Sequence, residues 1–92
     1  MIKEFTLGAI KWVVKQDNNR LDDLGLMGLC ETPKSLISIY TDSFNANLID
    51  QNIIHEVTHA ILESMGENEL SHNEKFVQNF SLLLHQFIVT KK

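Results

Sequence analysis

Ionisable side chains interrupt a helix-forming segment that is otherwise apolar. Apolar residues between positions 49 and 65 recur at helical spacing and cover more than one face, which predicts a central, largely buried helix. This helix contains His55-Glu56-Val57-Thr58-His59, an H-E-x-x-H pattern. Burying these polar groups without partners is costly, so the fold has to supply partners for them, and a metal ion would do so.

The spacing of the pattern assigns a role to each residue. His55 and His59 are four residues apart and therefore project from one face of the helix, where two imidazoles can bind the same zinc ion. Glu56 points about 100° away around the helix, because an α-helix has 3.6 residues per turn. It can reach a water molecule at the zinc without binding the metal, so we interpret it as a general base.

The first forty residues have the short apolar runs and turn residues of β-strands. The expected segments are strands at 5–7 and 10–14 around Gly8-Ala9, a loop at 17–23, a strand at 24–31 bulged near Gly28, a turn at 32–35 and a strand at 37–40. Two helices follow. The first is expected to run from a cap at Asp42 or Ser43 to about Met65, with Gly66 ending it in the left-handed conformation.

The second helix is expected from about residue 72 to 88, with Ser71 as its N-cap. Its apolar stripe has helical spacing and consists of Phe76, Val77, Phe80, Leu83, Leu84, Phe87 and Ile88. The predicted fold class is therefore α+β: a small N-terminal antiparallel sheet of three or four short strands, followed by the H-E-x-x-H helix and a C-terminal helix. Ninety-two residues are enough for one domain, spanning 1–92.

Charge and composition exclude several classes of partner. The net charge of −4 argues against nucleic acid as a partner, because nucleic-acid binding normally requires a basic face. Cys30 is the single cysteine, so no disulfide can form within the chain. We see neither a signal-peptide pattern nor an apolar run of about 18 residues, and we expect a cytoplasmic protein without membrane contact. The sequence does not indicate an oligomeric state.

A catalytic zinc needs a third protein ligand. Glu63 lies one more turn along the same helix, and three ligands in line on a straight helix cannot surround a tetrahedral ion. We therefore expect Glu63 to support the ligands from outside or to lie in solvent. The better donors are His72, Glu74 and His85 on the second helix. Spacing alone favours a capping box for Ser71-x-x-Glu74, in which Glu74 would bond back to the helix N-terminus.

The residues also resemble a known family. The H-E-x-x-H segment followed by Asn73-Glu74 on the next helix resembles the gluzincin arrangement, in which a downstream glutamate is the third zinc ligand. More closely, the chain is similar to short phage- and prophage-encoded metallopeptidases related to the ImmA/IrrE-type peptidases. The similar segments are Gly25-x-x-Gly28-x-Cys30, Ile37-Ser38-Ile39, Ala60-Ile61-Leu62 and Glu74-Lys75-Phe76-Val77.

This resemblance implies His55 and His59 as zinc ligands, Glu74 as the third ligand and Glu56 as the base, in a minimal zincin-like fold. His72 is the alternative third ligand, or a donor to the developing oxyanion. The expected function is zinc-dependent hydrolysis of a peptide or protein substrate. An exposed sheet edge near the site would bind an extended peptide by strand addition, although the sequence leaves open which strand forms that edge.

Two other functions remain possible from the sequence. A non-catalytic, zinc-stabilised regulatory or interaction module would need four ligands and would recruit two of His72, Glu74, His85 and Cys30. Glu56 favours the catalyst over this module, because a structural site has no use for that carboxylate. A helical interaction protein without a metal requires the histidine spacing to be accidental.

Overall fold

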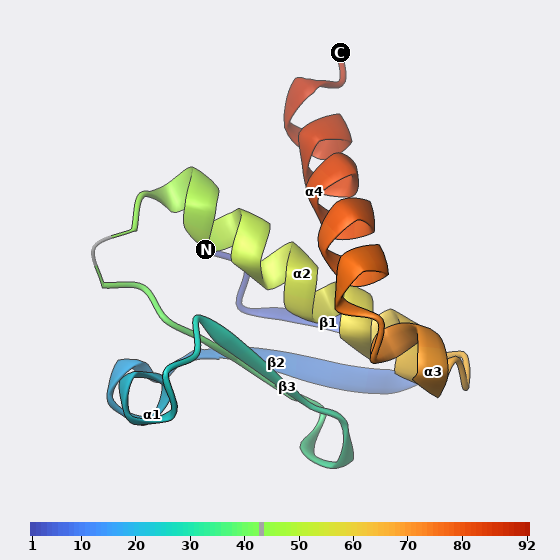
Figure 1. The fold of residues 1–92 in the computed structure, drawn as a ribbon, viewed down its shortest axis with the longest axis horizontal. Coiled ribbons are helices and arrows are strands. Elements are labelled where there is room, and N and C mark those ends of the chain that lie inside the picture. Colours follow the sequence, from blue (N-terminus) through green and yellow to red (C-terminus); the bar gives the residue numbers. More distant parts are fainter. Residues whose placement is uncertain (43) are drawn as a thin grey trace.

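The computed structural model describes residues 1–42 and 44–92, and these form an α+β fold in which a sheet is followed by helices (Figure 1). The elements in chain order are β1 (Glu4–Leu7), β2 (Ile10–Gln16), α1 (Asn18–Leu24), β3 (Gly28–Glu31), the 3-10 turn η1 (Thr32–Lys34), β4 (Leu36–Ile39), α2 (Ala46–Ser64), α3 (Asn68–Ser71) and α4 (Glu74–Thr90). The two predicted N-terminal strands and the strand before α2 are confirmed within one or two residues.

The sheet has four strands in the order β1-β2-β4-β3. Two of its pairings are antiparallel, between β1 and β2 and between β3 and β4, but β2 and β4 run parallel. The prediction of a wholly antiparallel sheet is therefore wrong. After β2 the chain passes through α1 and forms β3 two positions away in the sheet. The intervening position is then filled by β4, which runs parallel to β2. As a result, β3 lies at an edge of the sheet.

The segment expected to be a loop at 17–23 instead contains α1. Leu21 is fully buried, and the side-chain oxygen of Asn18 accepts a 2.8 Å hydrogen bond from the backbone N–H of Thr41. Gly25 ends the helix with a φ of 68°, which favours glycine. Asn and Asp are weak helix formers, so these contacts with distant residues, rather than local propensity, stabilise the helix.

The hydrophobic core lies between the sheet and α2, which crosses one face of the sheet (Figure 1). Alternate residues of β2 and β4 face this helix, as expected where successive side chains point to opposite sides of a strand. The buried core residues are Trp12, Val14, Ile37, Ile39, Ile53 and Ala60.

The start of α2 differs from the prediction. Asn45 is the N-cap, and its side chain accepts a 2.8 Å hydrogen bond from the backbone N–H of Leu48. Asp42 is therefore not the cap, and the alternative cap, Ser43, lies outside the described residues. At the other end Gly66 has a φ of 78°, which confirms the predicted left-handed conformation.

The C-terminal region contains two helices where one was predicted. The short α3 ends at Ser71, and α4 begins at Glu74 after its own N-cap, Asn73. The side chain of Asn73 accepts a 3.1 Å hydrogen bond from the backbone N–H of Phe76. Ser71 is therefore not an N-cap, and the expected capping box with Glu74 is not formed.

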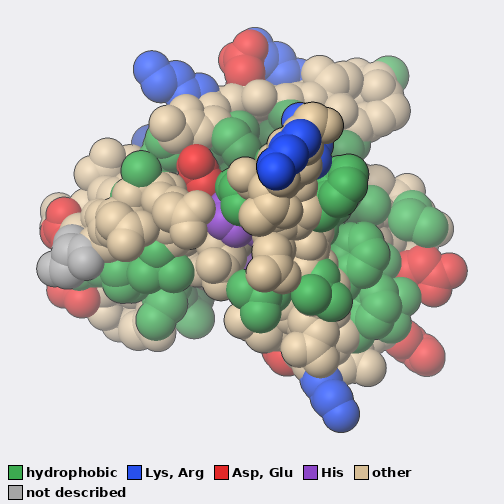
Figure 2. All heavy atoms as spheres, turned by 90° about the horizontal axis from the view of Figure 1, so that it is seen from above, with side chains coloured by type: hydrophobic (Ala, Val, Ile, Leu, Met, Phe, Trp, Pro, Cys, Tyr) green, Lys and Arg blue, Asp and Glu red, His purple; other side chains and the backbone are tan. Residues whose placement is uncertain are grey.

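The apolar stripe of α4 is largely exposed, although its spacing suggested a buried face. The face turned towards α2 carries Glu74 and the buried residues Val77, Ser81 and His85. This orientation leaves Leu83 and other stripe residues outside, with Leu83 64% exposed. Hydrophobic side chains are visible on the surface in the view from above (Figure 2). Among residues 1–42 and 44–92, no helix has the length and apolarity needed to cross a membrane.

Candidate metal centre

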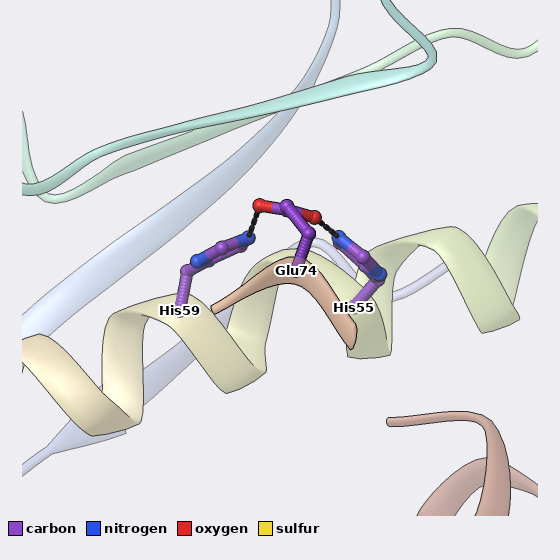
Figure 3. A group of neighbouring side chains, drawn as sticks. All are labelled: His55, His59 and Glu74. Carbon is purple, nitrogen blue, oxygen red and sulfur yellow. Dashed lines mark ion pairs between the residues drawn. The ribbon is translucent and has the colours of Figure 1, made fainter. Parts of the chain in front are cut away.

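His55, His59 and Glu74 come together at the junction of α2 and α4 (Figure 3). One donor atom from each lies within 4.8 Å of the others. The Glu74 carboxylate lies between the two rings, with Oε2 3.5 Å from Nε2 of His55 and Oε1 3.3 Å from Nε2 of His59. The side chains of the two histidines are 20% and 14% exposed. These three residues lie close enough to bind one metal ion.

Local structure explains how Glu74 reaches the histidines. The histidines are one helical turn apart on α2, as their spacing predicts, and their ring centroids are 5.2 Å apart. Because the backbone at the start of α4 is capped by Asn73, the Glu74 side chain is free to turn towards α2. Glu74 also lies in the first turn of α4, where the helix dipole favours a negative charge.

The donor set fits a small divalent cation. Ligand atoms about 2.0–2.2 Å from a tetrahedral zinc ion lie about 3.3–3.5 Å from one another. The two distances between imidazole and carboxylate, 3.5 and 3.3 Å, fall in this range, and each runs to a different oxygen of Glu74. One donor atom from each of the three residues lies within 4.8 Å of the others, so the side chains would move closer together around a bound ion. A carboxylate only accepts hydrogen bonds, so an unprotonated Nε2 that faces it needs either a cation or a bridging water molecule between the two atoms.

Glu56 lies beside this group without belonging to it. Its side chain packs against Gly28 of the edge strand β3, where a Cβ would lie 2.9 Å from Oε2 of Glu56. Gly28 pairs regularly with Ile39, so the bulge expected near Gly28 is absent, and the missing side chain instead leaves room for Glu56. Burial, and to a smaller extent the negative charge of Glu74, raise the pKa of Glu56 to about 7. A carboxyl group with such a pKa can accept and release a proton near neutral pH.

The environment of His55 favours its neutral form. Burial lowers the pKa of His55, and a positive charge on His59 would lower it further, although Glu74 and Gln78 act in the opposite direction. Metal binding needs the neutral ring, because the ligand atom must offer a lone pair.

A hydrogen-bonded network supports His59 from the side opposite Glu74. Nδ1 of His59 lies 3.0 Å from Oγ of Ser71, and that hydroxyl donates a 2.9 Å hydrogen bond to Oε2 of Glu63. The hydroxyl of Thr32 donates a 2.6 Å hydrogen bond to the other oxygen of Glu63. Of the two alternatives for Glu63, outer support or solvent, the structure shows the first. Only the spacing of Glu63 pointed to this network from the sequence, which suggested a helix cap for Ser71 and no contact with His59 for either Ser71 or Thr32.

The three grouped residues and Glu56 line one cavity of about 460 Å³. Its wall includes Leu26 and Gly28 from the chain leading into β3. His72 also lines it but does not belong to the group that can hold an ion. A metal ion in the group would thus have an open side facing the cavity.

The remaining donor candidates are not part of the group. His85 is only 4% exposed and lies three helical turns beyond Glu74, about 16 Å along the axis of α4. Burial raises the pKa of the Cys30 thiol to about 12, which opposes the thiolate form that binds metals. Comparison with protein-family models, with curated proteins and with solved structures finds no match for this chain.

Proposed function

We propose that this chain hydrolyses peptide bonds with a zinc ion held by His55, His59 and Glu74, and with Glu56 as the general base. One observation carries the proposal: the donor atoms of two histidines and one glutamate lie within 4.8 Å of one another, beside the partly buried carboxylate of Glu56. The chain would then be a minimal zincin-like peptidase of the gluzincin type. This is also what its resemblance to the short phage and prophage metallopeptidases implies.

The donor chemistry supports zinc. Two imidazole nitrogens and one carboxylate oxygen form a three-ligand set typical of catalytic zinc sites, which keep a fourth position for water or substrate. A structural zinc normally has four protein ligands, whereas the group found among the described residues has three members. The non-catalytic zinc module therefore has less support. Iron(II) also binds two histidines and one carboxylate, so a test of the proposal must identify the metal.

Glu56 supplies the proton transfers that hydrolysis requires. A bound zinc ion acts as a Lewis acid, making water acidic near neutral pH and polarising a carbonyl group. Glu56 takes a proton from the attacking water as the water oxygen bonds to the carbonyl carbon. Glu56 then passes this proton to the nitrogen of the amine as the C–N bond breaks. A pKa of about 7 suits both transfers, because the group must be a base first and an acid afterwards.

The edge strand β3 offers a place for an extended peptide substrate. It lies at the edge of the sheet, and its first residue, Gly28, packs against Glu56. A peptide added alongside β3 would gain main-chain hydrogen bonds and would pass close to the general base. Leu26, just before the strand, adds an apolar side chain to the cavity wall. The position of β3 at the edge of the sheet therefore supports it as the strand that would pair with a peptide.

Metal analysis of untagged protein, together with two variants and one control variant, tests the proposal. We expect wild-type protein to take up one equivalent of zinc and to cleave members of a degenerate peptide library, as detected by mass spectrometry. Glu56→Ala should retain zinc and lose cleavage. Glu74→Ala should lose most of its zinc affinity, whereas Glu69→Ala, which removes an acidic residue in α3 outside the group, should not.

Wild-type protein that binds no divalent metal at micromolar concentration would refute the zinc site. Zinc binding without cleavage of any peptide would favour the non-catalytic module. Cleavage by Glu56→Ala at the wild-type rate would remove Glu56 from the mechanism. If Glu74→Ala binds zinc as tightly as wild type does, the third ligand would have to be another residue, and His72 is the one that already lines the cavity.

A further inference from the structure

The buried hydrogen bonds around Nδ1 of His59 determine which nitrogen of its ring carries the proton. Ser71 is 1% exposed, so its hydroxyl must find partners within the protein. It contacts two groups, Nδ1 of His59 at 3.0 Å and Oε2 of Glu63 at 2.9 Å. A serine hydroxyl has a single hydrogen to donate, and here it is donated to Glu63. The contact with His59 must therefore run the other way, with Nδ1–H donating to the serine oxygen.

The hydrogen bond from Thr32 to Glu63 fixes which groups donate and which accept in this network. Its hydroxyl donates to Oε1 of Glu63, so both oxygens of that carboxylate already accept a hydrogen bond. A carboxylate has no proton to return to Ser71. The only donor left to satisfy the serine oxygen within this network is the ring of His59. The proton of a neutral His59 therefore belongs on Nδ1, and its lone pair belongs on Nε2, the atom that faces Glu74.

We propose that Glu63, acting through Ser71, is a positioning residue that holds His59 in the metal-binding tautomer. The inference rests on the proposed function for its use, but the proton assignment stands on the hydrogen bonds alone. Glu63 is four residues after His59 on α2, Ser71 ends α3 and Thr32 begins η1. The network thus joins three elements at one histidine and fixes the rotation of its ring. Partners of this kind contribute about 10–100-fold to metal affinity in other metal sites.

Zinc affinity is the first readout, measured by competition with a chromophoric chelator on the full chain. We expect Ser71→Ala and Glu63→Gln each to weaken zinc binding by about 10–100-fold. Glu63→Gln keeps the shape of the side chain but replaces one acceptor oxygen with a donor group. Ser71→Thr, which keeps the hydroxyl, should restore most of the affinity that Ser71→Ala loses.

Ser81→Ala is the matched control. Ser81 is equally buried, at 1% exposed, and among the described residues its hydroxyl bonds to the backbone oxygen of Gln78 within α4. This control should change zinc affinity by less than about threefold, because it removes a buried hydroxyl without touching the network. If it weakens binding as much as Ser71→Ala, the effect is general loss of packing and the inference is wrong.

The tautomer of His59 is the second readout and does not involve metal. Nitrogen-15 NMR of metal-free protein at pH 8.5 distinguishes a ring protonated at Nδ1 from one protonated at Nε2. We expect the Nδ1–H form in wild type and a shift towards the Nε2–H form in Ser71→Ala and Glu63→Gln. The Nε2–H form in wild type, or no shift in either variant, would overturn the inference.

The two readouts separate this inference from the proposed function. Wild-type protein that binds no zinc would refute the function, yet the NMR result would still decide the proton assignment. Tight zinc binding that neither variant weakens would refute the role of Glu63 and Ser71 while leaving the metal centre intact. Because Glu63→Gln is nearly isosteric, it keeps the test valid even if Ser71→Ala folds poorly.

Discussion

Replacing Gly28 by alanine tests how closely the edge strand packs against Glu56. A Cβ at position 28 would lie 2.9 Å from Oε2 of Glu56 and 3.0 Å from its Cγ, whereas ordinary contacts begin at 3.4 Å. The side chain, or the strand, must therefore move by about 0.5 Å, because protein interiors have little spare volume. Rotating the carboxylate alone does not help, since Cγ is also too close.

The magnitude follows from two opposing effects. Inserting a methyl group into a packed site costs about 1–3 kcal/mol. Replacing glycine by alanine restricts the unfolded chain and stabilises a protein by about 0.4–1 kcal/mol when the backbone allows it, and Gly28 does not have a positive φ. We expect Gly28→Ala to lower the free energy of unfolding in wild type but to raise it by about 0.4–1 kcal/mol in Glu56→Ala, where the space is empty.

A double-mutant cycle measured by urea unfolding provides the assay. Trp12 is the single tryptophan and is 2% exposed, so its fluorescence should report global unfolding. The coupling free energy between positions 28 and 56 should be about 1–3 kcal/mol, equal to the packing cost that Glu56→Ala removes. Effects that add to within about 0.5 kcal/mol would show that the two residues are not in contact and would refute the reasoning.

Three further predictions concern other parts of the chain. Because burial raises the pKa of Cys30 from 9.0 to about 12, the unfolded chain should ionise before the folded one does, so stability should fall as the pH rises from 9 towards 12. Urea unfolding at several pH values should show that the free energy of unfolding falls less over this range in Cys30→Ala than in wild type. An equal fall in both proteins would contradict the raised pKa of Cys30. Asn73→Ala should cost about 1 kcal/mol in thermal unfolding, because it removes the N-cap of α4; no loss would mean that the cap is dispensable. Val77→Ala should cost about 2 kcal/mol and Leu83→Ala less than about 0.5 kcal/mol, whereas the reverse order would place the other face of α4 against α2.

Local spacing was enough to predict the centre of the candidate site. His55 and His59 share a helical face wherever that helix lies, because the geometry of residues four apart depends only on the helix itself. The strands on either side of Gly8 and the left-handed Gly66 are also local features, since each depends on the conformational preferences of a few adjacent residues. For these features the sequence contains the physical cause.

Tertiary contacts decided the rest. Glu74 had two local interpretations, cap and ligand, and it lies at the histidines because Asn73 caps α4 and the helix is rotated towards α2. The same rotation leaves most of the apolar stripe of α4 exposed, which periodicity cannot foresee because periodicity does not say which face meets a neighbour. The contact between Thr32 and Glu63 joins residues 31 positions apart. Such pairings arise only when the whole chain packs, so no local pattern could have predicted them.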